Sequence, residues 1–274
     1  MGFSCLWFLS RPLTAAGLSN ITLRRTPSHH TYTFKQGFEN NVAEIMAQDL
    51  RRAVQFVWLS KLAPYAERKL GPDACDLSMA AASPTKEMLP SIPYYRSSYV
   101  FVTRADRHLD IASLNDPHLA SYRIGAQIIG DADEATPPAE ELAQRGLASN
   151  IIAYTVFGYP LGRNTAQEMI NAVTKGDLDL AIVWGPAAGY FAKSSAVPLV
   201  ITRILPSSGK PSLPEAFDIS VGVRRGDDEL RQQVNEIITR RQKEISAVLT
   251  RYGVPLLDRP SAGRARGSGE ANAN

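Results

Sequence analysis

The sequence predicts an α/β fold in which two lobes face each other across a cleft. Segments with the β-branched and aromatic content of strands alternate with segments of helical hydrophobic spacing through most of the 274 residues, a pattern typical of a parallel or mixed sheet covered by helices. The alternation comes in two runs, and a long amphipathic helix near the carboxyl end then needs an apolar surface to cover. We expect that surface in the first lobe, so the chain crosses between the lobes twice.

The first run begins with a short strand at residues 21–25 and a helix after Gly37, where apolar residues recur at intervals of three and four. A short helix is expected at 65–70, before the breakers Gly71 and Pro72. The remaining elements are runs rich in β-branched, aromatic or small apolar residues, which predict strands. These strands span residues 53–59, 77–81 and 99–103.

The second run repeats this order. One helix starts at the prolines after Thr136, because proline is favoured in the first helical turn, and ends before Gly146. A second helix starts at Thr165, which together with Glu168 predicts a capping box, and Gly176 is a natural residue to end it. The strands of this run span residues 123–128, 151–157 and 178–184.

The last third returns to the first lobe. Residues 199–204 and 217–223 predict strands, and apolar residues at helical spacing predict one long helix over 229–252. The first twenty residues contain a short apolar stretch without a basic region before it, which we interpret as a degraded secretion signal or a disordered end. The carboxyl tail is too polar to pack. The expected organisation is a signal-like or disordered end at 1–20, a first lobe at 21–103 plus 189–258, a second lobe at 104–188 and a disordered tail at 259–274.

Charge and composition exclude several classes of protein. There are 30 lysines and arginines against 27 acids, and the positive excess lies at the two ends, so the body lacks the basic face of a nucleic-acid-binding protein. No apolar run approaches the ~20 residues of a membrane span. The two cysteines and four histidines show no metal-ligand spacing. We therefore predict no catalytic residue, no metal and no cofactor.

Six blocks of the sequence together resemble one family. The most specific tract runs from the string PYYRSSYVFV to the string WGPAAGYF, and the resemblance covers residues 21–257. The chain is similar to the quinoprotein-dehydrogenase-associated periplasmic solute-binding proteins of the family 3 type (MoxJ/XoxJ-like), to which the J proteins of methanol-oxidation gene clusters belong. The blocks are GFENNVAEIMAQDL (37–50), IPYYRSSYVFVTR (92–104), RIGAQIIGDADEATPPAEELAQRG (123–146), DLDLAIVWGPAAGYFA (177–192), FDISVGVRRGDDELR (217–231) and YGVPLL (252–257).

The resemblance implies a type II periplasmic binding protein fold, with two α/β lobes joined by a two-segment hinge. It also implies a non-enzymatic protein of the periplasm that assists the maturation or activity of a pyrroloquinoline-quinone (PQQ)-dependent methanol or alcohol dehydrogenase. The family's first strand resembles L-R-V-C-A-D-P, whereas residues 21–27 read ITLRRTP. Cys75 therefore lacks the cysteine partner that the resemblance implies.

Two other classes of function stay open. The hinge topology also suits the substrate-binding component of an ABC importer for a small polar solute. Amino-acid-binding members of the wider superfamily place an arginine soon after the third strand to bind a carboxylate in a bidentate pair. The comparable turn here, residues 83–88, contains no arginine, which disfavours a carboxylate ligand. Lys86 in this turn either substitutes for the arginine as a point charge or is simply solvated. An enzyme on the same fold would need a carboxylate and a neighbouring base in the cleft, and no residue stands out in that role.

Six residues are candidates to line the cleft, because ligands of open α/β sheets bind beyond the carboxyl ends of strands. Tyr94 and Tyr95 lie at the approach to the hinge, where they either face a ligand or pack against the hinge segments. The aspartate either faces the cleft or caps a helix, and the acidic cluster that it begins is interpreted as a solvated turn rather than a calcium site. The tryptophan ends a strand beside the second crossing, as cleft wall or as core. The candidates are Tyr94, Tyr95, Gly130, Asp131, Trp184 and Gly185.

Overall fold

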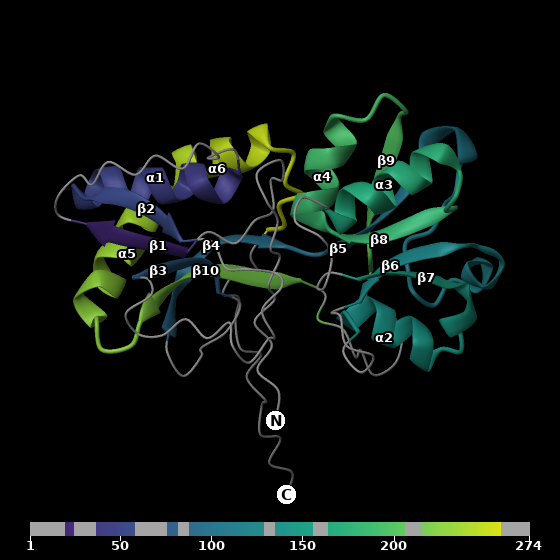
Figure 1. Cartoon of the computed structure of the whole chain (residues 1–274), viewed down its shortest axis with the longest axis horizontal. Coiled ribbons are helices and arrows are strands. Elements are labelled where there is room, and N and C mark those ends of the chain that lie inside the picture. The colour runs from purple at the N-terminus through teal and green to yellow at the C-terminus, as the bar shows by residue number, and fades with distance from the viewer. Residues whose placement is uncertain are drawn as a thin grey trace, which may run out of the picture.

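The computed structural model describes residues 20–24, 37–57, 76–81, 88–128, 135–155, 164–205, 214 and 216–258. Two five-stranded sheets lie side by side, each with its own helices (Figure 1). This arrangement confirms the predicted α/β fold with two lobes. The signal-like end apart from Asn20, the expected helix at 65–70 and the tail lie outside the described residues.

The first lobe is built on a sheet in the order β2-β1-β3-β10-β4, in which all neighbouring strands are antiparallel. Its strands are β1 (Asn20–Arg24), β2 (Ala53–Val57), β3 (Leu77–Ala81), β4 (Met88–Ser97) and β10 (Phe217–Arg224). Three helices of this lobe pack against one another. They are α1 (Phe38–Leu50), α5 (Asp228–Arg240) and α6 (Gln242–Arg251).

Strand β4 is an addition to the elements that the sequence predicts. Pro90 and Pro93 lie within it, and proline argues against a strand inside a sheet because it cannot donate to the ladder. The structure explains the exception, since β4 is the edge strand and pairs with β10 alone among the described strands. Proline is tolerated at such an edge, and the pairing shifts register on either side of Ser220.

The expected long carboxy-terminal helix is corrected to two helices, α5 and α6. They meet at Arg241, whose backbone (φ −97°, ψ 12°) departs from helical values. The guanidinium groups of Arg240 and Arg241 both bind Asp49 on α1, each with an N–O distance of 2.6 Å. Because both helices also contact α1, the bend at Arg241 keeps their two buried faces on the same neighbour.

The second lobe is built on a mixed sheet in the order β7-β6-β8-β5-β9. Strand β6 is parallel to β7 and β8, whereas β5 is antiparallel to β8 and β9. The strands are β5 (Tyr99–Arg104), β6 (Ile124–Ile128), β7 (Ile151–Thr155), β8 (Leu180–Trp184) and β9 (Leu199–Arg203). The helices are α2 (Pro137–Gln144), α3 (Thr165–Lys175) and α4 (Gly185–Lys193), with short 3-10 turns η2 (Ala105–Arg107), η3 (Pro117–Ser121) and η4 (Ala148–Asn150).

Helix α3 shows how a local signal is displaced by one residue. The helix begins at Thr165 as expected, but its N-cap is Asn164, whose Oδ1 accepts a hydrogen bond from the backbone N–H of Gln167 at 3.1 Å. The predicted capping box at Thr165 is therefore corrected, and the threonine hydroxyl is left for a different partner. Gly176 ends the helix as predicted, with φ at 82°.

The chain crosses between the lobes from β4 to β5 and returns from β9 to β10. Since β10 pairs with β4 and β9 pairs with β5, the same two segments are neighbours in both lobes. The expected lobe boundaries at 103 and 189 are therefore corrected, because β5, α4 and β9 all belong to the second sheet and its cover. Strand β5 is almost wholly buried, so its composition suits the centre of either sheet. Its pairing with β8 and β9 is what assigns it to the second lobe.

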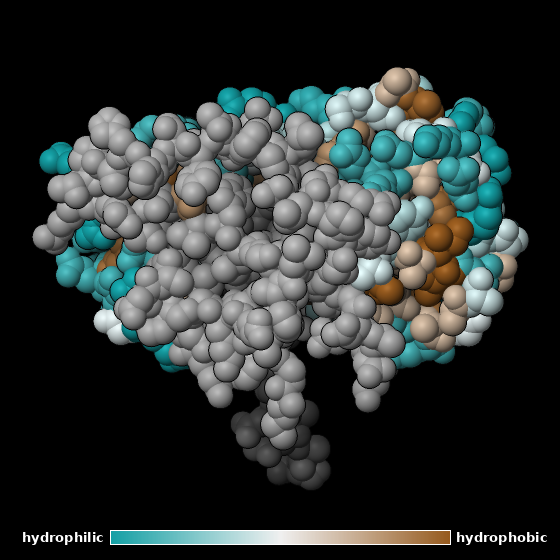
Figure 2. All heavy atoms as spheres, viewed as in Figure 1, coloured by the Kyte–Doolittle hydropathy of each residue, from teal (hydrophilic) through white to brown (hydrophobic). Residues whose placement is uncertain are grey.

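The apolar core is continuous through the junction of the lobes. One cluster contains Phe38 and Ile237 of the first lobe together with Leu180 of the second, and another lies under α3 and α4. Figure 2 shows an apolar patch on the second lobe where Figure 1 places β6 and β7, and Ile152 of β7 is exposed. In the part of the chain that the structure describes, no helix has the length and apolar character needed to cross a membrane.

Candidate functional site at the lobe junction

The structure brings four of the six predicted cleft residues to the junction between the lobes. Tyr94 and Tyr95 lie in the second half of β4, Trp184 ends β8 and Gly185 begins α4. All three aromatic side chains are buried, which agrees with their packing in the hinge. Contact of these residues with a ligand stays a prediction, and the pair at 130–131 lies outside the described residues.

The two tyrosines of β4 are held in the neutral form. The Tyr94 hydroxyl donates to the backbone oxygen of Met79 at 2.6 Å, and the two tyrosine rings meet edge to face with centroids 4.9 Å apart. Burial raises the pKa of both hydroxyls well above its usual value, and the negative charge of Glu39 adds to the rise. For Tyr95, a hydrogen bond with Trp184 opposes part of this rise. Both groups are therefore uncharged hydrogen-bonding partners at neutral pH.

We expect Tyr94→Phe to lower the free energy of unfolding by about 1 kcal/mol, because the buried carbonyl of Met79 loses its donor. Urea titration measures the change. Tyr122→Phe is the control, since Tyr122 is only partly buried and surface changes stay within ~0.5 kcal/mol. An effect of Tyr94→Phe no larger than that of the control would show that this hydrogen bond does not stabilise the junction.

Three aromatic rings from three strands join the two sheets. Trp184 of β8, Tyr99 of β5 and Phe217 of β10 meet edge to face with centroids 5.4 to 6.0 Å apart. The Tyr99 hydroxyl is buried without a hydrogen-bond partner among the described residues, and burial raises its pKa. A bound hydrogen-bond acceptor would satisfy this group. Sequence reasoning missed Tyr99, because the string YVFVT signals a strand and nothing more.

Gly185 allows α4 to begin directly against the first crossing. Its backbone N–H donates to the oxygen of Ser98 at 2.9 Å, and a Cβ at this position would lie 2.7 Å from that oxygen and 2.9 Å from Ser97 Oγ. The Ser97 hydroxyl in turn donates to the backbone oxygen of Pro255 at 2.8 Å. Helix α4, the crossing and the segment after α6 therefore pack with no room for a side chain at Gly185.

A second polar group lies at the carboxyl end of β6. The buried Gln127 donates through Nε2 to Thr165 Oγ1 at 2.7 Å, and its backbone oxygen accepts from Thr136 Oγ1 at 2.6 Å. The first turns of α2 and α3 thus meet at Gln127, whose Oε1 has no partner within the described ranges. A lone glutamine in a strand has no motif that would have revealed it. No group of three or more His, Cys, Asp or Glu side chains in these ranges is placed to hold a metal ion.

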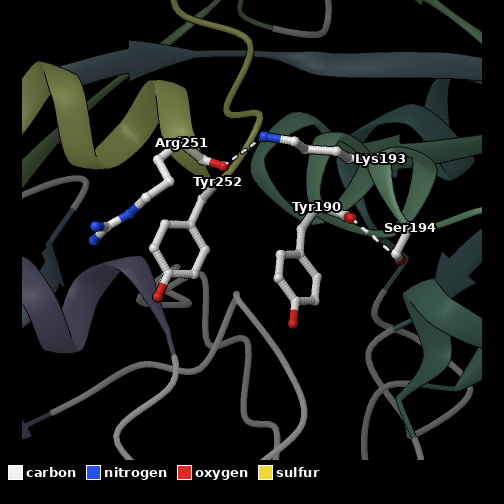
Figure 3. A pocket seen from close by; sticks show the side chains of 5 residues that line it. All are labelled: Tyr190, Lys193, Ser194, Arg251 and Tyr252. Atoms are coloured by element: carbon white, nitrogen blue, oxygen red, sulfur yellow. Dashed lines mark hydrogen bonds between the residues drawn. The ribbon is translucent and has the colours of Figure 1, made fainter.

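A pocket of about 290 Å³ opens where α4 meets the end of α6 (Figure 3). The rings of Tyr190 and Tyr252 stack, with centroids 6.0 Å apart and an interplanar angle of 22°. Lys193 Nζ donates to the backbone oxygen of Arg251 at 2.9 Å, and Ser194 completes the lining. Both lobes therefore contribute to this pocket, which is lined mainly by aromatic faces and two cationic side chains.

Comparison with known proteins was made on the sequence and on the fold. No family model matches the chain. The chain is 31% identical over 232 residues to protein MoxJ of Methylorubrum extorquens AM1. This match covers 81% of this chain and 76% of MoxJ. The solved structure of the periplasmic binding protein XoxJ from Methylobacterium extorquens AM1 has a TM-score of 0.64 at 33% identity, over 82% of this chain and 92% of that chain. The solved structure of MxaJ from Methylophaga aminisulfidivorans MPT has a TM-score of 0.68 at 27% identity, over 85% of this chain and 97% of that chain.

Amino-acid-binding proteins of the same architecture are less similar to the chain. An ancestral cationic amino acid solute-binding protein, for example, has a TM-score of 0.58 at 18% identity, a likeness that shows the fold alone. The sequence identity to MoxJ, 31%, is higher than the identity to these amino-acid-binding proteins, and the match extends over most of both chains. With the two-lobed fold and its double crossing, it shows that the chain belongs to the MoxJ family of periplasmic binding proteins.

Proposed function

We propose that this protein works in the periplasm, where it binds a PQQ-dependent methanol or alcohol dehydrogenase and assists its maturation or activity without catalysing a reaction itself. Membership of the MoxJ family carries the proposal, because the likeness to MoxJ covers 81% of the chain. The proposed partner is a protein, and we expect no nucleic acid, metal or cofactor to take part in its binding.

The chemistry of the junction supports a protein-binding role over the transport of a charged solute. Tyr94 and Tyr95 are neutral and buried, and Trp184 packs against aromatic rings of both lobes. A charged solute such as an amino acid is normally held by a charged side chain or a paired hydrogen-bond donor, and Tyr94, Tyr95 and Trp184 offer no charge. The two cationic side chains of the pocket between α4 and α6 already have partners in the protein, because Lys193 Nζ donates to the backbone oxygen of Arg251 at 2.9 Å and Arg251 Nη2 donates to Asn41 Oδ1 at 3.4 Å. The importer alternative has no comparable support, since the similarity to importer receptors is confined to the fold.

Co-purification tests the proposal directly. The tagged full-length chain, expressed in a methanol-oxidising host, is expected to retain the large subunit of the dehydrogenase through affinity and size-exclusion steps. Deletion of the gene is expected to lower both dehydrogenase activity and the PQQ content of the purified enzyme. Unchanged activity and cofactor content in the deletion strain would refute the proposed role.

A thermal-shift screen separates this role from that of a solute receptor. A ligand present at 100 times its dissociation constant adds ~2.7 kcal/mol to the stability of a protein that binds it only when folded. We expect no such shift with amino acids, small alcohols or organic acids. A reproducible rise in melting temperature with one of these solutes would favour the importer alternative.

A further inference from the structure

The two lobes meet at a third place besides the two crossing segments. Helix α4 of the second lobe lies against the end of α6 in the first (Figure 1). Here Gly189 and Gly253 meet backbone to backbone: a Cβ on Gly189 would lie 1.8 Å from the carbonyl oxygen of Gly253, and a Cβ on Gly253 would lie 2.9 Å from that of Gly189. Real Cβ atoms essentially never come within 3.0 Å of another heavy atom, so neither position accepts a side chain without a shift of the backbone.

Side chains on both sides reinforce the contact between the glycines. The ring of Tyr190 on α4 stacks on the ring of Tyr252 (Figure 3), and Tyr252 is tied to the first lobe because its hydroxyl accepts from Asn41 Nδ2 at 2.9 Å. Lys193 of α4 donates to the backbone oxygen of Arg251, one of the last carbonyls of α6, which have no partner within the helix. The contact thus combines close backbone packing, an aromatic stack and a charged hydrogen bond.

We propose that this seam, formed by Gly189, Tyr190 and Lys193 on one side and residues 251–253 on the other, is a latch that fixes the angle between the lobes. Helix α4 starts at the first crossing, and Gly189 follows Gly185 by about one helical turn, ~5.4 Å. Rotation of the lobes about the crossing in one direction drives the glycine backbones together. Rotation in the other direction separates the stacked rings and breaks the lysine hydrogen bond.

The latch implies that the protein holds one lobe arrangement when no ligand is present. Receptors that close on a solute instead rotate their lobes about a hinge and populate open and closed forms. The latch is a property of this chain alone and does not depend on the dehydrogenase. A result that disproves the latch would not argue against the dehydrogenase as partner. A negative co-purification result would likewise not argue against the latch.

The distance between the lobes in the full-length protein tests the latch. Spin labels on Gln167 of α3 and Gln242 of α6, both exposed, report this distance by pulsed electron paramagnetic resonance, in a background with Cys5 and Cys75 replaced by serine. We expect a single narrow distribution for this parent protein. A broad distribution, or two populations, would overturn the proposal.

Substitution of the glycines tests the cause of the fixed angle. In Gly189→Ala the two backbones must separate by about 1.2 Å for the new Cβ to reach 3.0 Å, although alanine is otherwise favoured over glycine within a helix. We expect the lobe-to-lobe distance to shift by several ångströms or its distribution to broaden, with an unchanged far-ultraviolet circular dichroism spectrum. An identical distance distribution in Gly189→Ala and the parent would overturn the role of the glycine contact.

Gly253→Ala has a matched control in Gly226→Ala. Both glycines have positive φ, 73° and 86°, so alanine strains the backbone at each, but a Cβ on Gly226 would meet no atom within 4 Å. Only Gly253→Ala is expected to change the distance between the lobes, and an equal change in the control would contradict the latch. If the glycine variants do not fold, Tyr190→Leu combined with Lys193→Met removes the stack and the hydrogen bond. We expect a broad distribution for that variant, and a narrow, unchanged one would refute the proposal.

Discussion

Replacement of Trp184 by alanine is expected to lower the free energy of unfolding by about 3–5 kcal/mol. The indole is 5% exposed and packs against Tyr99 of the second sheet and Phe217 of the first. Its removal leaves a cavity at the point where the two sheets share a core. We therefore expect the dependence of unfolding on denaturant to become less steep as well, because the lobes no longer unfold as one unit.

Phe191→Ala is the control that removes a buried aromatic ring at a position outside the three-ring contact between the sheets. Phe191 is equally buried but belongs to the apolar cluster under α3 and α4, and not to the cluster that continues through the junction of the lobes. A similar loss of stability is expected, without a change in the steepness of denaturant unfolding, because the lobes still unfold as one unit. Guanidinium titrations of both variants, followed by far-ultraviolet circular dichroism, measure the two effects. A loss below about 1 kcal/mol for Trp184→Ala would show that the ring does not hold the sheets together.

The second large effect is a loss of stability in acid that depends on Asp49. Hydrogen bonds from Arg241 and Arg240 lower the pKa of this carboxyl from 3.8 to about 2 in the folded protein. Because the folded pKa lies below the unfolded one, the stabilisation by this carboxylate is fully present above pH ~5 and is lost progressively as the pH falls through 3.8 toward 2. We expect Asp49→Asn to lower the free energy of unfolding at pH 7 by about 1–2 kcal/mol, a value reduced by solvent screening around the two arginines.

Asp228→Asn is the matched control for this prediction. Asp228 also forms an ion pair with an arginine, Arg231, at 2.7 Å, but its side chain is 69% exposed against 9% for Asp49. Exposed pairs contribute about 0–1 kcal/mol, so its loss is expected to be small. Urea titrations at pH 7, 4 and 3 compare the variants. If Asp49→Asn loses as much stability between pH 4 and pH 3 as the parent does, another group causes the acid sensitivity.

The candidate site was only partly accessible from the sequence. Tyr94, Tyr95 and Trp184 were identified because they flank the expected crossings, and the structure places them together there. Tyr99 and Gln127 were missed, since an aromatic or polar residue within a strand pattern says nothing about which other strands its side chain will meet. The tight contact of Gly189 with Gly253 was equally invisible, because 63 intervening residues separate the two positions along the chain.

The amino-acid sequence by itself determined the alternation of strands and helices, the expectation of two lobes and the family. It also located the end of α3 at Gly176, because glycine is favoured where φ must be positive. Hydrophobic periodicity and capping signals act over a few residues, so a single chain reveals them without knowledge of the fold.

Only the tertiary structure decided which lobe receives β5 and β9, that 185–193 form a helix, and that β4 is an edge strand able to contain prolines. The physical reason is that a strand's own residues do not specify its partners: β5, buried on both faces, fits the centre of any sheet, and β9 is a partly exposed edge strand that suits the edge of either one. The place of a strand follows from hydrogen bonds to partners distant in sequence, as when β5 pairs with β8 and β9, and no local pattern of residues encodes those partners.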